Sequence, residues 1–347
     1  MNIDIALWLA QDGITNGAIY ALLALALLLV FAVTRIIFVP QGEFISYAAL
    51  SLALLQAGRL PGTVFVLVIG GLVAAAFDGV IAIRDGEWRR LPRIIALYVM
   101  LPVGMAAITW WAAPLNLPLW LQVLIVLGLV VPLGPILYRV AYRPLAGASV
   151  LVLFIISMAA HYVLTGLGLV FFGGEGLRAA PFSEAKFQLG VLSITAQSLL
   201  VVFASIVIML VLWLLFDRTI YGKALRATAI NRVGARLVGI PTELSGSLSF
   251  ALAAFIGAVS GILIAPITTI YYDTGFLIGL KGFVGAILGG MGSYPLAVLG
   301  AVALGMLESF SSFWASAFKE VIVFTIIIPV LVWRSLTSVH HVEDEEQ

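Results

Sequence analysis

The sequence predicts an all-α protein that crosses a membrane repeatedly, with about 8–10 transmembrane helices, some of them broken or re-entrant. Hydrophobic residues make up 63% of the chain and charged residues 10%, whereas an ordinary soluble domain has roughly 45–50% and 25%. Apolar runs of about 20 residues, enough to cross a bilayer, recur along the whole chain. They are apolar throughout, while the strands of a membrane β-barrel are short and alternate in polarity. We therefore treat residues 1–347 as a single transmembrane domain.

The apolar runs define the spans. The first run is too long for the core of a signal peptide, and acids rather than bases precede it, so we expect it to be retained. The predicted spans are Ile14–Thr34, Phe44–Leu55, Thr63–Ile83, Ile94–Ala113, Trp120–Tyr138, Val150–Phe171, Ile194–Phe216, Leu244–Ala265, a divided region Phe283–Phe310, and Phe318–Trp333. Residues 335–347 form a polar tail.

Basic loops between the spans orient the chain. Arg84–Arg93 carries four bases and two acids, Arg139–Arg143 carries two bases, and residues 217–243 carry five bases and two acids. Lysine and arginine near span ends are retained in the cytoplasm. Placing these three loops inside puts the N-terminus and the loop Gly173–Gln188 outside. The segment 217–243 is therefore predicted to be cytoplasmic.

Two segments do not resemble uniform spans. Phe44–Leu55 is short and follows Pro40 and Gly42, and because proline removes a backbone donor we expect a break or re-entry there. The glycine-rich stretch Gly282–Pro295 predicts that Phe283–Leu288 is a half-helix that reverses at a turn. The last span then ends in the cytoplasm.

Small residues four positions apart occur in Gly257-Ala-Val-Ser-Gly261 and Gly285-Ala-Ile-Leu-Gly289. Such spacing lets helix backbones approach closely in a membrane. It also arises by chance in a chain with 34 glycines, and both interpretations stay open.

Catalytic motifs are missing from the sequence, so we expect neither enzymatic activity nor a cofactor. The nearest fragment to a phosphate loop, Gly279-Leu-Lys281, lacks the further glycines and the hydroxyl that such a loop needs. The chain has no cysteine, which excludes disulfides and thiolate metal sites. His161 stands alone in its span and either lines a path or, as we favour, bonds a neighbouring carbonyl. Uphill work would need a partner ATPase or an ion gradient.

A gradient-driven carrier needs ionisable groups within its spans. The candidates are Glu43, Asp78, Asp273, Lys281 and Glu308. We place Asp78 near the membrane interface, and Asp273 with Lys281 in an external hinge that water reaches. Only Glu43 and Glu308 are hard to solvate. Two such acids are weak support for ion coupling, so an ion-gradient-driven secondary transporter is the alternative hypothesis. A membrane scaffold without transport is a further rival.

The cytoplasmic segment Gly222–Ile240 has the features of a docking helix. On a helix, Arg232 and Arg236 lie one turn apart on one face. Ile230, Val233 and Leu237 form an apolar ridge beside them. Such a helix suits a groove on a soluble partner, although a plain basic loop that only sets the topology has the same composition.

This segment resembles the coupling loop of the branched-chain amino acid family of ABC transporter permeases. That family has the pattern Gly-x-Ala-x-Arg-Ala-Thr-Ala-x-(Asn/Asp)-Arg-x-x-Ala-Arg-x-x-Gly-Ile. The matching residues are Gly222, Ala224, Arg226, Ala227, Thr228, Ala229, Asn231, Arg232, Ala235, Arg236, Gly239 and Ile240. Similar stretches occur, in the family's order, at residues 13–25, 142–147, 247–254, 257–263, 279–293 and 300–308. Together they cover well over half of the chain.

The resemblance implies a multi-pass permease of the bacterial inner membrane, surrounded by lipid and without a nucleic-acid partner. Two cytoplasmic ABC ATPase subunits would bind ATP and grip the coupling residues, which are the matching residues above. A periplasmic or extracellular solute-binding protein would deliver a branched-chain amino acid or a related amide or carboxylate. A second, related permease would complete a heterodimer. The residues expected along the translocation path are Asn16, Tyr20, Gln41, Gly42, Glu43 and Glu308.

Two departures from the family pattern stand out. After the first span the family usually has Ile-Asn-Phe-Ala-His-Gly-Glu, whereas this chain has Ile37-Phe-Val-Pro-Gln-Gly-Glu43. If this segment lines the path, the solute need not be a branched-chain amino acid. The chain is also longer than expected at residues 77–118, which we interpret as an extra helical hairpin with Arg84–Arg93 as its charged loop.

Overall fold

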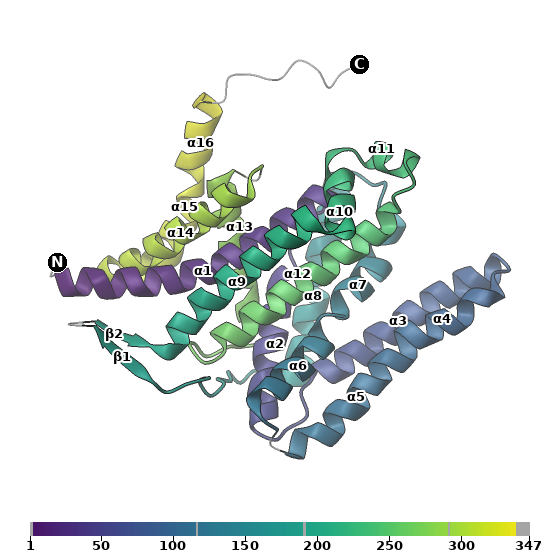
Figure 1. Ribbon diagram of the computed structural model, residues 1–347, viewed down its shortest axis with the longest axis horizontal. Coiled ribbons are helices and arrows are strands. Elements are labelled where there is room, and N and C mark those ends of the chain that lie inside the picture. The colour runs from purple at the N-terminus through teal and green to yellow at the C-terminus, as the bar shows by residue number, and fades with distance from the viewer. Residues whose placement is uncertain (1–2, 116, 190–191, 291, 338–347) are drawn as a thin grey trace.

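The computed structural model describes residues 3–115, 117–189, 192–290 and 292–337. Within these ranges nine helices are long and apolar enough to cross a membrane, which confirms the all-α polytopic class (Figure 1). The helices are α1 Ile3–Thr34, α2 Gln41–Gln56, α3 Thr63–Arg84, α4 Leu91–Ile95, α5 Leu101–Ala112, α6 Leu119–Val130, α7 Leu133–Leu137, α8 Val150–Phe172, α9 Ala196–Arg218, α10 Ile220–Ile230, α11 Arg232–Leu237, α12 Thr242–Ile264, α13 Thr274–Gly289, α14 Tyr294–Trp314, α15 Lys319–Thr325 and α16 Ile327–Thr337. The chain crosses once as α4 and α5 and once as α6 and α7, in continuous helical rods that span 88–115 and 119–145.

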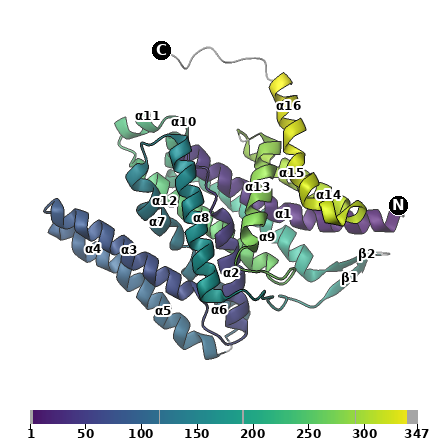
Figure 2. The same cartoon turned by 180° about the vertical axis from the view of Figure 1, so that it is seen from behind.

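The centre of the bundle consists of α1, α2, α12 and α13, which pack against one another. Every residue of α2 from Gln41 to Leu55 is buried. Helices that are apolar on all sides belong in such a core. By contrast, α5, α8 and α9 expose many large apolar side chains, as helices that face lipid do. Figures 1 and 2 show α3, α4 and α5 at one side of the bundle.

The predicted break before the second apolar segment is confirmed. α1 ends at Thr34, and Arg35 takes a left-handed backbone conformation with φ of 60°. α2 then begins after Pro40, and Gln41 donates from Nε2 to the carbonyl of Ala253 in the middle of α12, at 3.0 Å. α2 therefore begins deep in the bundle and is longer than the predicted Phe44–Leu55.

The predicted turn in the divided region Phe283–Phe310 is confirmed, but the half-helix before it starts earlier than predicted. α13 ends at Gly289, and the next residue, Gly290, has a left-handed φ of 79° before the chain continues into α14. The half-helix begins at Thr274 rather than Phe283. Residues up to Lys281 were expected to form a hinge, but the glycines of residues 274–282 pack against α1 and α2. Lys281 is consequently buried within α13, so its placement in a water-filled hinge was wrong. Asp273 is exposed as predicted.

Both pairs of closely spaced glycines mark real helix contacts. A Cβ on Gly261 would lie 2.3 Å from the carbonyl oxygen of Ile45, and one on Gly289 would lie 2.1 Å from that of Leu296. Glycine therefore permits α12 to pack on α2, and α13 on α14, at backbone distance.

A short β-hairpin begins at the end of the predicted external loop Gly173–Gln188 and continues to Thr195, so the span predicted from Ile194 begins instead with α9 at Ala196. β1, Lys186–Leu189, pairs in antiparallel fashion with β2, Leu192–Thr195, so that Lys186 lies opposite Thr195. Residues 77–118, interpreted as an added hairpin, comprise the end of α3 and the rod that contains α4 and α5. Of the polar tail, residues 338–347 lie outside the described residues, and residues 335–337 belong to α16.

Candidate functional site

The segment Gly222–Ile240, predicted to be cytoplasmic, lies in two helices rather than in the single helix expected. Thr219 caps α10 by accepting a hydrogen bond from the backbone of Gly222 at 3.0 Å. Asn231 ends α10 in an extended conformation and caps α11, where Oδ1 accepts from the backbone of Gly234 at 2.8 Å. Asparagine competes with helical hydrogen bonding and favours N-caps. That preference explains the break, and it makes the segment a fixed elbow.

Several residues of the family pattern maintain the shape of this elbow. A Cβ on Gly222 would lie 2.1 Å from the carbonyl oxygen of Leu215, so only glycine lets α10 fold back on the end of α9. Gly239 has a left-handed φ of 84° directly after α11, which other residues rarely adopt. Ala235 is buried, and Ala227, Ala229 and Ile240 are partly buried.

Three polar residues that match the family pattern attach the elbow to the rest of the bundle through hydrogen bonds. Thr228 on α10 donates to the hydroxyl of Ser245 on α12 at 3.2 Å. Arg236 on α11 donates from Nε to Thr242 at 2.9 Å. Arg232 donates to the carbonyl of Ala146 at 3.3 Å, which connects the elbow to the chain segment just before α8. These contacts position the elbow and leave another surface free.

That surface consists of large apolar side chains at the variable positions of the pattern. We call Ile230, Val233, Leu237 and Val238 the coupling patch; their exposed fractions are 78%, 68%, 83% and 76%. The sequence singled out the first three as a ridge. Figure 1 shows α10 and α11 protruding at one end of the bundle. Arg226 points elsewhere and lines a groove bounded by α1, α9 and α14.

A buried carboxylate–imidazole pair lies at the start of α2. Glu43 is 2% exposed, and its Oε1 is 2.5 Å from Nδ1 of His161 on α8. Thr165 donates to the same oxygen at 3.4 Å. The ring of Phe276 on α13 stacks on His161 with centroids 4.2 Å apart. His161 therefore binds a carboxylate, and the expected bond to a carbonyl was wrong.

Glycines bring the start of α13 against this pair. A Cβ on Gly275 would lie 1.9 Å from the carbonyl oxygen of Gly42. The backbone of Gly275 also donates to Ser46 at 2.8 Å. The first turns of α2 and α13 thus touch backbone to backbone, deep in the bundle.

A second buried cluster joins four helices. Lys281 on α13 donates to Glu308 on α14 at 2.6 Å and to Glu320 on α15 at 3.0 Å. Tyr20 on α1 donates to the other oxygen of Glu308 at 2.6 Å. Sequence reasoning placed Tyr20 and Glu308 on the path, assigned Lys281 to a hinge instead, and missed Glu320. An isolated lysine within an apolar helical run was the signal that could have identified Lys281.

The residues expected along the path thus fall into two groups. Gln41, Gly42 and Glu43 form the first turn of α2, and Tyr20 contacts Glu308. Asn16 is partly buried on α1, one turn before Tyr20. α13 contacts both groups, through its glycines and through Lys281.

An apolar cavity of about 190 Å³ lies beside the first group. Gln41, Phe38, Met158 and Phe276 are among its lining residues. Oε1 of Gln41 and Oε2 of Glu43 are buried and have no hydrogen-bond partner among the described residues. Such acceptors are costly to leave unpaired, so this region is prepared for a donor.

Asp78, assigned to the membrane interface, is buried near the end of α3. Arg139 donates to both of its carboxylate oxygens at 2.7 Å. Arg143 forms an ion pair with Glu243 at 2.7 Å. This charged cluster joins α3 to the basic stretch Arg139–Arg143 and to α12, so a structural role accounts for Asp78.

Comparison with known proteins identifies the family. The sequence matches the family described as the permease component of branched-chain amino acid transport systems over residues 94–331. The chain belongs to this permease family. It is therefore the membrane-spanning permease subunit of an ABC importer, in which ATP is hydrolysed on separate subunits, and its family is one of transport permeases rather than enzymes.

Individual relatives agree with this assignment. The permease is 27% identical to the high-affinity branched-chain amino acid permease protein BraD of Pseudomonas aeruginosa over 80% of this chain and 92% of BraD. It is 30% identical to LivH of Escherichia coli strain K12 over 56% of this chain and 65% of LivH. Among solved structures, PsaBC from Streptococcus pneumoniae in complex with Fab aligns with a TM-score of 0.42 and 12% identity, over 93% of this chain and 89% of that chain.

Proposed function

We propose that the permease imports a small aliphatic amino acid, or a closely related amide or carboxylate, across the bacterial inner membrane. Two cytoplasmic ABC ATPase subunits drive the import by gripping the α10–α11 elbow. A solute-binding protein delivers the solute at the outer face, and a second, related permease completes the translocation unit. The observation that carries this proposal is the exposed coupling patch on the capped α10–α11 elbow.

The coupling patch supports the proposal because its large apolar side chains are exposed, and binding a partner would bury them. Ile230, Val233, Leu237 and Val238 stand outside the membrane spans and are all more than two-thirds exposed. Burying one such side chain contributes about 1.5–3 kcal/mol. The caps at Thr219 and Asn231 fix the elbow, so little ordering entropy opposes docking. An apolar helix face inserted into a groove is a standard mode of recognition.

The pair formed by Glu43 and His161 supports the choice of solute. The cavity beside Gln41 is apolar and small, as an aliphatic side chain requires. The unpaired acceptors on Gln41 and Glu43 suit the ammonium group of an amino acid. Branched-chain amino acids are named in the titles of the relatives BraD and LivH, which is consistent with such a solute.

The decisive experiment replaces Leu237 or Val233 with aspartate in the assembled transporter. An acidic side chain in the centre of the patch should weaken ATPase binding and ATP-driven uptake by about tenfold or more, since it removes at least 1.4 kcal/mol of apolar burial. Co-purification with the ATPase subunits and uptake into proteoliposomes measure the two effects. Phe187→Asp in the external hairpin, also an exposed apolar residue, is the matched control and should retain ATPase binding. A Leu237→Asp complex that assembles and transports normally would contradict the proposal.

The buried charges favour one alternative. Lys281, Glu308, Glu320 and Glu43 could serve proton or sodium coupling in a secondary transporter. The same proteoliposomes separate the two mechanisms. Solute accumulation under an ion gradient, without ATP or partner subunits, would establish the alternative.

A further inference from the structure

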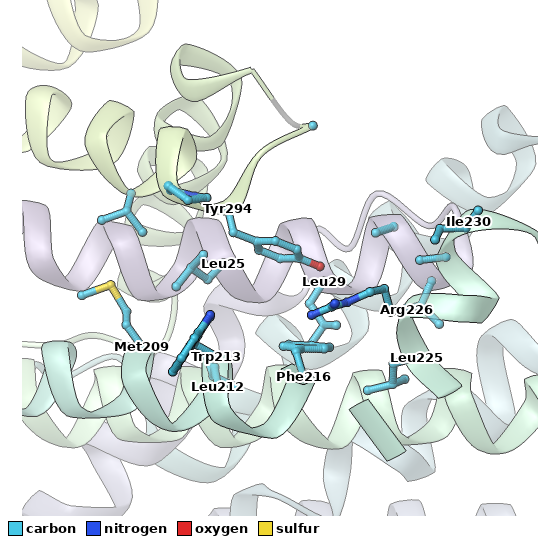
Figure 3. Close-up of a pocket in the computed structure, with 16 residues that line it drawn as sticks. Leu25, Leu29, Met209, Leu212, Trp213, Phe216, Leu225, Arg226, Ile230 and Tyr294 are labelled. Atoms are coloured by element: carbon cyan, nitrogen blue, oxygen red, sulfur yellow. The ribbon is translucent and has the colours of Figure 1, made fainter. Parts of the chain in front are cut away.

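A groove of about 530 Å³ lies where α9 passes into α10, bounded also by α1 and α14 (Figure 3). Its walls are apolar for most of their length. Leu25 and Leu29 from α1 face Met209, Trp213 and Phe216 from α9. The groove plays no part in the translocation path described above, and α10 provides its end wall.

The groove has a polar end formed by two side chains. The guanidinium of Arg226 and the hydroxyl of Tyr294 are turned toward each other across it (Figure 3). The ring of Tyr294 is stacked with that of Phe216, with centroids 6.0 Å apart. Arg226 makes no ion pair or hydrogen bond through its side chain with any residue that the structure describes. No acid is among the lining residues, so a positive charge faces the groove uncompensated.

The groove lies at the end of α9 that the distribution of basic residues predicts to face the cytoplasm. α9 ends at Arg218, where the basic cytoplasmic segment begins, and Trp213 lies five residues earlier. Tryptophan at such a position marks the headgroup region. Trp213 is 56% exposed and Leu210 beside it 53%, so the apolar wall continues into a surface that lipid covers.

We propose that this groove binds an anionic glycerophospholipid of the cytoplasmic leaflet. One acyl chain lies along Leu25, Leu29, Met209 and Trp213. The phosphate accepts hydrogen bonds from the guanidinium of Arg226 and the hydroxyl of Tyr294. Arginine pairs strongly with phosphate, and basic pockets between transmembrane helices on the cytoplasmic side recognise anionic headgroups. A lipid is favoured over a protein face because the uncompensated cation stands at headgroup depth beside an apolar wall.

The bound lipid would also brace the elbow. α10 contributes Leu225, Arg226 and Ala229 to the groove, and α10 carries the coupling patch through α11. A lipid in the groove therefore holds α10 against α1 and α14. This consequence, unlike the lipid site itself, rests on the proposed grip of the ATPases.

Quenching of Trp213 by brominated lipid tests the site. The full-length permease is placed in phosphatidylcholine nanodiscs that contain increasing fractions of dibrominated phosphatidylglycerol or dibrominated phosphatidylcholine. Because the chain has eight tryptophans, the signal of Trp213 is taken as the difference from Trp213→Phe. We expect half-quenching at an about fivefold lower fraction of the anionic lipid, the preference that one arginine near the surface provides.

Variants make the result specific. Arg226→Gln should abolish the preference for the anionic lipid, and Tyr294→Phe should reduce it. Lys223→Gln, which removes the same charge one turn earlier on α10 and outside the groove, should retain it. Equal quenching by both lipids in the unmodified protein, or a preference that survives Arg226→Gln, would overturn the proposal. A Trp213 that neither lipid quenches would show that a protein face covers the groove, which overturns it too. The quenching experiment does not depend on ATPase binding. Its result therefore tests the lipid site independently of the proposed function.

Discussion

At the scale of single residues, the buried charges divide into those that neutralise one another and those with capacity left for a solute. Glu308 has partners on both carboxylate oxygens, Lys281 and Tyr20. Glu43 has partners on Oε1 only, and its Oε2 is buried without one. A buried carboxylate is costly unless it is paired. Glu43 is therefore the acid best prepared to receive a positively charged group.

We expect Glu43→Gln to raise the KM for the solute by about tenfold, because a charge-assisted hydrogen bond is lost while the volume is kept. Uptake kinetics in proteoliposomes measure this effect, and the melting temperature shows that folding is preserved. Glu87→Gln, in the exposed loop after α3, should leave uptake unchanged. If Glu43→Gln transports with unaltered kinetics, Glu43 has only a structural role.

Prediction from sequence succeeded for residues whose signal is local. Glu43 and Glu308 stand out as acids in apolar runs, and both are buried. The hydrogen bond between His161 and Glu43 joins positions 118 residues apart. The hydrophobic periodicity of the sequence gives no information about such a long-range contact. Lys281 was misplaced because residues 271–281 were expected to form a hinge open to water, whereas their glycines permit close helix packing.

At the scale of elements, glycine contacts determine how α13 fits into the bundle. The sequence predicted the turn at its end, since Gly290 needs a left-handed conformation. The sequence did not predict where α13 starts. Residues 274–282 are helical because their glycines pack against α1 and α2, and a local pattern does not show this contact. Tertiary packing overrides the weak helix propensity of glycine here. The elbow shows the reverse case, in which the local capping preference of Asn231 broke a helix expected to be continuous.

Gly275→Ala should lower the free energy of unfolding by about 1–3 kcal/mol, because the new methyl group would overlap the carbonyl of Gly42. Thermal unfolding in detergent gives this value. Gly104→Ala in α5, where nothing lies within 4 Å of the added Cβ, should be neutral or slightly stabilising. Equal effects of the two substitutions would mean that α2 and α13 do not touch as described.

At the scale of the whole molecule, the Lys281 cluster joins the two ends of the chain. Tyr20 belongs to α1 and Glu320 to α15, and Lys281 with Glu308 connects them through α13 and α14. α13 also carries Phe276, which stacks on His161 beside Glu43. A movement of α13 would therefore disturb both buried clusters at once. This connection suits a permease that must change between two arrangements around its solute.

Lys281→Met should destabilise the permease by about 3–5 kcal/mol, because it leaves Glu308 and Glu320 buried or half-buried without their cation. The double substitution Lys281→Met with Glu308→Leu should recover a large part of this loss, since it removes the unpaired acid instead of restoring the pair. Melting temperatures of the single and double variants, with Glu308→Leu alone, complete a double-mutant cycle. Additive losses would show that Lys281 and Glu308 act independently, and α1 and α15 would then be held to the bundle by apolar packing alone. Strong coupling would establish that Lys281 and Glu308 stabilise the bundle as a pair.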